Sequence, residues 1–222
     1  MLKQNKKNYI LIALILVIMA VGGISAYFTA VDDATNVFTS GNVQIDLQEP
    51  KYDEVPEERQ AITPNQELTK DPQVTNIGIN DAFIFLRVSI PKANVMTAAQ
   101  NGTVQPAILQ ELFLYTINSE WTQVEKKEGS SENTYVFAYG SASACTPLKA
   151  NQTTPVLFKD SKITFLNAVE GQGLEEQEFE IPVEAFGIQT TDLNDKTDKQ
   201  DKTAPADVWS ILLNQVDSKN AI

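Results

Sequence analysis

Ala82 to Ile90 reads AFIFLRVSI, a nearly continuous apolar run that stops before Pro91. Its β-branched and aromatic residues favour a strand, and a strand that is apolar on both faces belongs in the centre of a sheet. We therefore expect Phe85, Leu86 and Val88 to be buried. Because proline has no amide hydrogen to give to a neighbouring strand, the sequence predicts that this strand ends at Pro91.

Four other stretches have strand patterns, and polar spacers separate them. Asn42 to Leu47 alternates apolar and polar residues, as does a strand with one buried face. Glu178 to Glu184 alternates in the same way, and Pro182 indicates an edge strand. Shorter candidates are Thr134 to Tyr139 and Lys162 to Leu166. Short strands without βαβ alternation predict an all-β fold, an antiparallel jelly-roll-like β-sandwich with only short helices.

One helix is predicted near the C-terminus, over Ala204 to Val216. Pro205 suits the first helical turn, and Trp209 belongs to an apolar stripe with helical spacing. Gln105 to Tyr115 stays ambiguous, because its apolar residues fit a helical spacing but the run also fits a strand.

The composition weighs against an enzyme. The chain has 222 residues and no histidine, which removes the commonest general base and the paired histidines of a zinc protease. With 17 Lys+Arg against 29 Asp+Glu, the net charge of −12 argues against nucleic acid or anionic lipid as a partner. We therefore expect no catalytic residues, no cofactor and no bound metal.

Two smaller signals leave alternatives open. Cys145 is the single cysteine, so it allows no internal disulfide, and it is either an inert thiol or an intermolecular crosslink. Asp192 to Asp201 is rich in acidic residues but carries lysines among them and lacks the glycine and glutamate of an EF-hand. We interpret it as a solvated loop rather than a calcium site.

The N-terminus has the three parts of a secretory signal. Lysines precede the apolar run Tyr9 to Val21, and small residues precede a cleavage site between Ala26 and Tyr27. We expect residues 1–26 to form a helical signal peptide that is removed on export. Three lysines and no acidic residue leave with it, so 14 basic and 29 acidic residues remain. The alternative is an uncleaved anchor, since the uncharged stretch is long enough to cross a bilayer.

Residues 27–41 form a separate N-terminal arm before a single domain at residues 42–222. The arm is interrupted by Asp32-Asp33, yet it is too apolar for an idle tail. It packs on its own domain as an edge strand, or it is a donor strand for another copy. Its apolar residues, the candidates for assembly contacts, are Tyr27, Phe28, Val31, Val37 and Phe38.

The order of several motifs resembles the TasA/camelysin family of secreted matrix proteins. The matching stretches are Gly22 to Thr29, Asn36 to Thr39, Gly41 to Leu47, Ile62 to Asp71, Val74 to Gly78, the strand before Pro91, Trp121 to Val124, Tyr135 to Tyr139, Thr153 to Phe158 and Asp207 to Gln215. Asn65 departs from the pattern, because glycine is usual there. The resemblance spans most of the chain.

This resemblance implies a jelly-roll β-sandwich that a Gram-positive cell secretes and assembles into extracellular fibres of the biofilm matrix by donor-strand complementation. The implied partners are other copies of the chain, a minor fibre subunit and a signal peptidase of the SipW kind. The resemblance implies contact with the membrane only through the N-terminal segment, before that segment is cleaved. The metalloprotease label of some members does not carry over, because this chain has no histidine. The alternative function is a monomeric secreted or membrane-anchored accessory protein or adhesin of the cell surface.

Overall fold

The computed structural model describes residues 42–55, 62–175, 177–194 and 200–220. The chain divides into two units, Met1–Ser40 and Gly41–Ile222, and the fold described here is that of the second. The predicted signal peptide at residues 1–26 and the arm at residues 27–41 lie outside the described residues.

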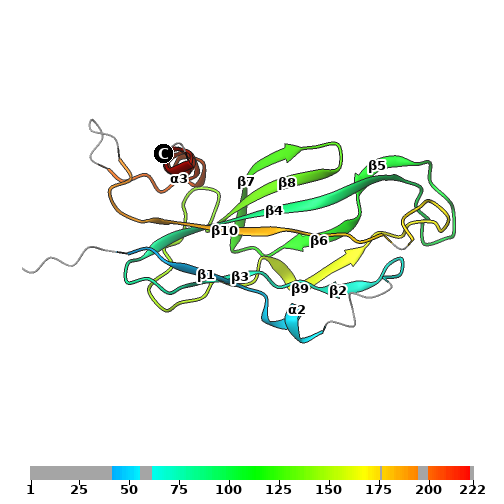
Figure 1. Ribbon diagram of the computed structural model, residues 1–222, viewed down its shortest axis with the longest axis horizontal. Coiled ribbons are helices and arrows are strands. Elements are labelled where there is room, and N and C mark those ends of the chain that lie inside the picture. Colours follow the sequence, from blue (N-terminus) through cyan, green and yellow to red (C-terminus); the bar gives the residue numbers. More distant parts are fainter. Residues whose placement is uncertain (1–41, 56–61, 176, 195–199, 221–222) are drawn as a thin grey trace, which may run out of the picture. The chain divides into compact units, whose positions relative to one another are not determined.

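Antiparallel strands dominate the second unit (Figure 1). One sheet has the order β10-β4-β8-β7, and β5 pairs with the end of β4. A second sheet has the order β2-β9-β6, and β1 pairs with β3. The strands are β1 (Ile45–Gln48), β2 (Glu67–Thr69), β3 (Gln73–Asn76), β4 (Ala82–Val95), β5 (Ile108–Glu111), β6 (Phe113–Ile117), β7 (Trp121–Glu128), β8 (Glu132–Tyr139), β9 (Phe158–Phe165) and β10 (Val183–Gln189). The predicted all-β, antiparallel, sandwich-like class is confirmed.

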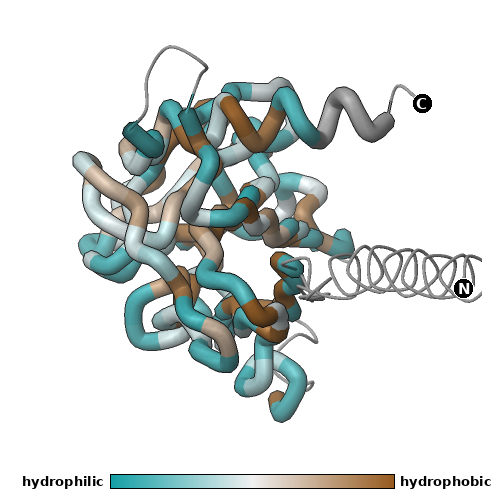
Figure 2. The backbone as a smooth tube through the Cα atoms, turned by 90° about the vertical axis from the view of Figure 1, so that its left-hand side faces the viewer, coloured by the Kyte–Doolittle hydropathy of each residue, from teal (hydrophilic) through white to brown (hydrophobic). Residues whose placement is uncertain are grey.

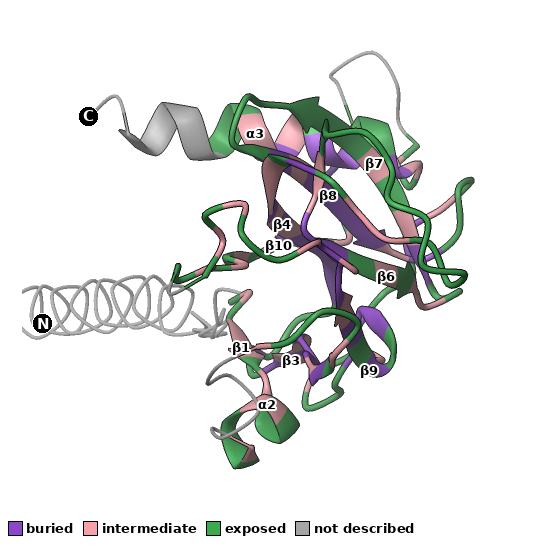
Figure 3. Cartoon of the chain, turned by 90° about the vertical axis from the view of Figure 1, so that its right-hand side faces the viewer, coloured by how far each residue is buried: buried purple, intermediate pink, exposed green. Residues whose placement is uncertain are grey.

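The core is built on both faces of β4, as its continuous apolar pattern predicts. Leu86 and Val88 belong to a large cluster shared with the second sheet. Phe85 points to the other face, into a smaller cluster under helix α3 (Pro205–Asn220). All three side chains are at most 1% exposed. Figure 3 shows the buried residues concentrated along the central strands.

The predicted end of this strand at Pro91 is wrong, because β4 continues to Val95. On one side of β4, Ser89 donates its amide to Pro182 O and Pro91 O accepts from Leu112 N. The partner on that side therefore changes at Pro91, from the segment before β10 to the segment after β5. The missing amide falls at this change of partner, so the ladder to β8 continues without it.

Other bounds also shift. The predicted strand Glu178 to Glu184 begins only at Val183, although β10 does lie at the edge of its sheet. The ambiguous run Gln105 to Tyr115 holds no helix: Ile108 to Glu111 is β5, and β6 begins at Phe113. The patterns did not predict the short helix α2 (Pro50–Glu54) or the strands β2, β3 and β7. These elements are short or polar, and tertiary pairing rather than local periodicity holds them.

Helix α3 covers part of the outer face of the five-stranded sheet. Three residues of its predicted apolar stripe are buried, with Val208 at 0%, Trp209 at 4% and Leu212 at 3% exposed, and Ile211 is half-buried. Apolar and polar residues alternate along it in Figure 2. The Trp209 ring lies 5.3 Å from that of Phe85, and its Nε1 donates to a Glu125 carboxylate oxygen at 2.8 Å. No helix in this described part is long and apolar enough to cross a membrane.

Candidate functional site

A groove of about 1220 Å³ lies between the β2-β9-β6 sheet and the chain that leads from β9 to β10. Its floor is aromatic. The Phe113 and Phe165 rings lie 5.5 Å apart, and Phe179 lies 6.4 Å from the first and 6.0 Å from the second. Phe113 and Phe165 are buried, whereas Phe179 is only half-buried. Among the described residues, the apolar core is therefore only partly covered on this side.

The segment from residue 178 to residue 182 forms one wall of the groove and has the pattern of a strand without its pairing. Phe179 and Ile181 are half-buried, while Glu178 and Glu180 are exposed. Its last residue, Pro182, accepts a hydrogen bond from Ser89 N at 3.1 Å. Among the described residues, no backbone hydrogen bond ties positions 178–181 to a neighbouring strand. This wall thus presents unpaired backbone groups beside apolar side chains.

The opposite wall is fixed by a buried ion pair. Lys70 Nζ lies 2.9 Å from a Glu49 carboxylate oxygen and 4.8 Å from the centre of the Tyr52 ring. Burial raises the pKa of Glu49 more than Lys70 lowers it. The Asp71 carboxylate accepts the Lys51 and Tyr52 amides, each at 3.0 Å, and so holds the first turn of α2. Tyr52 and Lys70 are therefore firmly positioned at the groove.

A glycine-rich turn closes one margin of the groove. Glu175 accepts hydrogen bonds from Gly171 N at 2.5 Å and Gly173 N at 3.0 Å. Hydrogen bonds from backbone amides, first its own, lower the pKa of this carboxyl. The Gln172 side chain bonds both the amide and the carbonyl of Met96, the latter at 2.9 Å. The turn is thereby pinned to the end of β4.

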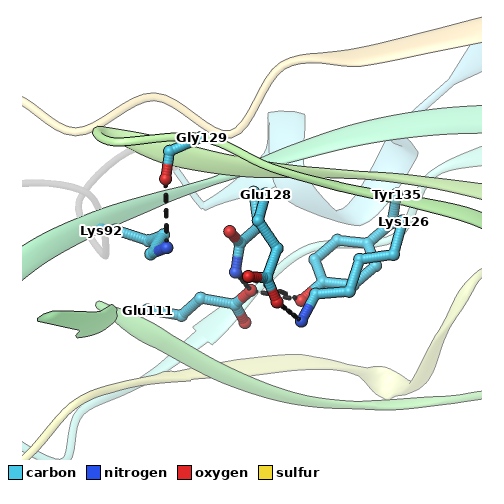
Figure 4. A network of polar contacts seen from close by, with 7 residues as sticks. Lys92, Glu111, Lys126, Glu128, Gly129 and Tyr135 are labelled. Carbon is cyan, nitrogen blue, oxygen red and sulfur yellow. Dashed lines mark hydrogen bonds and ion pairs between the residues drawn. The ribbon is translucent and has the colours of Figure 1, made fainter.

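A second polar network joins β5 to β8 (Figure 4). Tyr135 donates its hydroxyl to a Glu111 carboxylate oxygen at 2.5 Å, and Asn133 Nδ2 donates to the same oxygen at 2.6 Å. Burial raises the pKa of both Tyr135 and Tyr115, so neither phenol ionises near neutral pH. These groups fasten two strands together and supply neither a general base nor an activated nucleophile.

The other residues that the sequence singled out, Cys145 and the acidic loop Asp192 to Asp201, show no sign of a reactive or metal-binding site among the described residues. Cys145 is 5% exposed, and burial raises the pKa of its thiol to about 12, which supports the inert-thiol interpretation over a crosslink. Asp201 accepts hydrogen bonds from Leu193 N at 2.8 Å and Asn194 Nδ2 at 2.9 Å. Its carboxylate therefore stabilises the loop to which it belongs. Residues 195–199 of that loop lie outside the described ones. Within the described ranges, no group of three or more His, Cys, Asp or Glu residues could hold a metal ion.

The predicted site residues and the groove belong to different parts of the chain. The cleavage residues Ala26 and Tyr27 fall outside the described residues, as do the arm residues Phe28, Val31, Val37 and Phe38. The sequence did not predict the groove, because its floor brings Phe113 together with Phe165 and Phe179, which follow it by 52 and 66 residues in the chain. The one signal for it was the alternation over Glu178 to Glu184, which indicates a strand where the structure has no ladder before Val183.

Comparison of the chain with family models, with curated proteins and with solved structures gives no significant match.

Proposed function

We propose that this protein is a secreted structural subunit that assembles into extracellular fibres of a biofilm matrix by donor-strand complementation. The observation that carries this proposal is the groove beside the segment at residues 178–181, which has no backbone hydrogen bond to a neighbouring strand among the described residues. The alternative of a monomeric accessory protein or adhesin would leave this part of the sandwich without a partner.

An added strand would supply the backbone pairing that residues 178–181 lack. Backbone groups at a sheet edge accept an extended peptide as a further strand, and alternate side chains of that peptide enter apolar pockets. Phe179 and Ile181 are half-buried, so such a strand would complete their burial. Each square ångström of apolar surface removed from water contributes about 25 cal/mol. A groove of about 1220 Å³ has room for several side chains of such a strand.

The proposed occupant is the arm at residues 27–41 of a neighbouring copy. Its 15 residues span about 50 Å when extended, several times the length of the unpaired wall. Its five large apolar residues, Tyr27, Phe28, Val31, Val37 and Phe38, suit an aromatic floor. The Asp32-Asp33 pair divides them into two groups, so one group can seat in the groove while the acidic pair stays in water.

Export and processing complete the proposal. The N-terminal signal pattern supports secretion and cleavage by a signal peptidase of the SipW kind, with a minor fibre subunit as a second partner. The absence of histidine and the neutral phenols and thiol described above support a non-catalytic role.

The test compares chains by electron microscopy: the secreted chain from Tyr27, a chain from Asn42, and single variants of the groove. We expect filaments from the first, a folded monomer from the second, and filament loss in Phe179→Ser. Phe186→Ser is the matched control, since that ring is also half-buried but packs against Trp209 on the other face of the sheet. Circular dichroism confirms folding in each case.

Two results would contradict the proposal. Filaments that form equally well without residues 27–41 would refute the donor role of the arm. A folded monomer at every salt and protein concentration tried would favour the accessory-protein alternative.

A further inference from the structure

Exposed apolar side chains gather at the two ends of β4. The large apolar residues that are more than a third exposed in the described chain are Ile77, Ile79, Met96, Val104, Ile108, Leu109 and Leu114. The first two precede β4, and the other five follow its last residues or lie on β5 and β6. Because β4 has 14 residues, its ends lie about 45 Å apart. Single exposed apolar residues are common on protein surfaces, whereas exposed apolar residues that lie close together indicate a contact surface. We therefore treat the two groups as two separate surfaces.

The first surface, here called the turn surface, consists of Ile77 and Ile79. The two side chains are 47% and 65% exposed. Their turn is rigid, because Ile77 N and Gly78 N both donate to Gln44 O at 2.9 Å and Ile79 N donates to Asn42 O at 3.2 Å. A side chain at Gly78 would lie 2.5 Å from Asn42 O, so the close approach requires glycine. The turn therefore presents both isoleucines in a fixed position.

The second surface, here called the ribbon surface, consists of Val104, Ile108 and Leu109. Their side chains are 53%, 57% and 51% exposed. Ile108 pairs with Val95 and Leu109 with Asn94, so they point to opposite faces of a two-stranded ribbon. The face of Ile108 also carries the buried Val95, and the face of Leu109 carries the exposed, polar Asn94. Ile108 and Leu109 are thus apolar side chains in water on opposite faces of the ribbon, and their exposure is unfavourable for a monomer.

The arm and the groove link these two surfaces. Asn42, where the described chain begins, is hydrogen-bonded to the turn surface through Ile79 and Asn80. The groove reaches the other end of β4, because Ala168 and Val169 line it while Ala168 bridges Thr97 and Val169 N donates to Met96 O at 3.0 Å. An arm that leaves one copy at its turn surface would therefore enter the next copy near its ribbon surface.

We propose that the turn surface of one copy packs against the ribbon surface of the next, as a head-to-tail contact beside the inserted arm. This inference rests on the proposed function. The two surfaces differ, so the contact is heterologous and does not close on itself, which is the geometry of open filaments. Its occupant is a second copy of this chain.

Cysteine cross-linking of the secreted chain tests the contact directly. The native Cys145 is buried, so introduced thiols report on the surfaces alone. A mixture of Ile79→Cys and Leu109→Cys chains should give a covalent dimer under mild oxidation, while either chain alone should not. Gln123→Cys, an exposed position on β7, is the control partner for each. A dominant 79–79 or 109–109 product, or no 79–109 product above the control, would overturn the proposal.

Serine variants give an independent measurement. Ile77→Ser/Ile79→Ser and Ile108→Ser/Leu109→Ser should each raise the protein concentration needed for filaments about tenfold or more. If the surfaces meet each other, combining all four changes adds little to either pair, whereas independent surfaces would multiply their effects. Unchanged urea midpoints show that folding is intact.

The cross-link separates this inference from the proposed function. Filaments that form without a 79–109 cross-link would retain the fibre subunit and overturn the contact. If the chain from Tyr27 forms no filament, the fibre function is refuted. A cross-link between residues 79 and 109 in that soluble chain would still support the contact. If that cross-link is also absent, the contact is overturned.

Discussion

Lys70 Nζ lies 2.9 Å from a carboxylate oxygen of Glu49, and the two side chains are 9% and 17% exposed at one wall of the groove. Removing one member of a buried pair leaves the other charge without compensation. We expect Lys70→Met to reduce the free energy of unfolding by about 3–5 kcal/mol, and Glu49→Leu/Lys70→Met to recover most of that loss. Urea denaturation measures both.

The matched control for this pair is Lys162, which bridges Glu67 on the surface with both side chains more than half exposed. Lys162→Met should change the free energy of unfolding by about 1 kcal/mol or less. Equal losses from Lys70→Met and Lys162→Met would show that burial of the Glu49 pair has no special effect.

The centre of β4 gives the second prediction. Leu86 is fully buried, so Leu86→Ala should cost about 2–5 kcal/mol of folding free energy. Leu114→Ala is the control, since Leu114 is 54% exposed and its change should stay within about 0.5 kcal/mol. A loss at Leu86 below about 1 kcal/mol would contradict its place in the core.

The apolar patterns predicted the central elements because burial dictates their sequence. β4 needs apolar residues on both faces, and the first turns of α3 need a stripe for Val208 and Trp209, so each leaves a signal in one local window. Pairing leaves a weaker signal. Whether the strand ends at Pro91 depends on its hydrogen-bond partners on one side of β4. These are Pro182, which accepts from Ser89, and Leu112, which donates to Pro91, and both are far from Pro91 in the sequence.

Sequence patterns could not predict the groove either, because it too depends on contacts between distant parts of the chain. Phe113, Phe165 and Phe179 each fit an ordinary core position, and nothing local shows that one of the three stays half-exposed. The alternation from Glu178 onward predicts a strand, and its failure to pair in the structure is the informative result. Local pattern and observed pairing thus disagree over residues 178–181.

The third prediction concerns Cys145. Burial raises the pKa of its thiol to about 12, so almost none of it is thiolate at pH 8. We expect iodoacetamide to leave the folded protein unmodified at pH 8 and to modify it rapidly in concentrated urea, where the thiol regains an ordinary pKa. Mass spectrometry measures the product. Rapid modification without urea, or a disulfide-linked dimer of the native chain, would restore the crosslink alternative.

The fourth prediction is cleavage between Ala26 and Tyr27. N-terminal sequencing of the protein recovered from culture medium should begin at Tyr27, because small residues there follow the apolar run. Recovery of the chain only in the membrane fraction, with residue 1 intact, would support the uncleaved anchor instead.

The last prediction is that salt accelerates assembly. After cleavage the chain keeps 14 basic and 29 acidic residues, a net charge of −15. Glu178 and Glu180 are exposed on the wall that would receive an arm carrying Asp32-Asp33. Like charges brought together by assembly repel each other, and 0.1 M salt shortens the screening length to about 10 Å.

Filament growth followed by light scattering should therefore be slow at 10 mM salt and faster at 150 mM. Glu178→Gln/Glu180→Gln should assemble at low salt as the parent chain does at high salt, because it removes the repulsion at the groove itself. Glu120→Gln/Asp207→Asn removes the same charge at exposed positions away from the groove and should have a smaller effect. If both double variants accelerate growth equally, net charge alone opposes assembly. The arm of one copy then does not bind in the groove of the next.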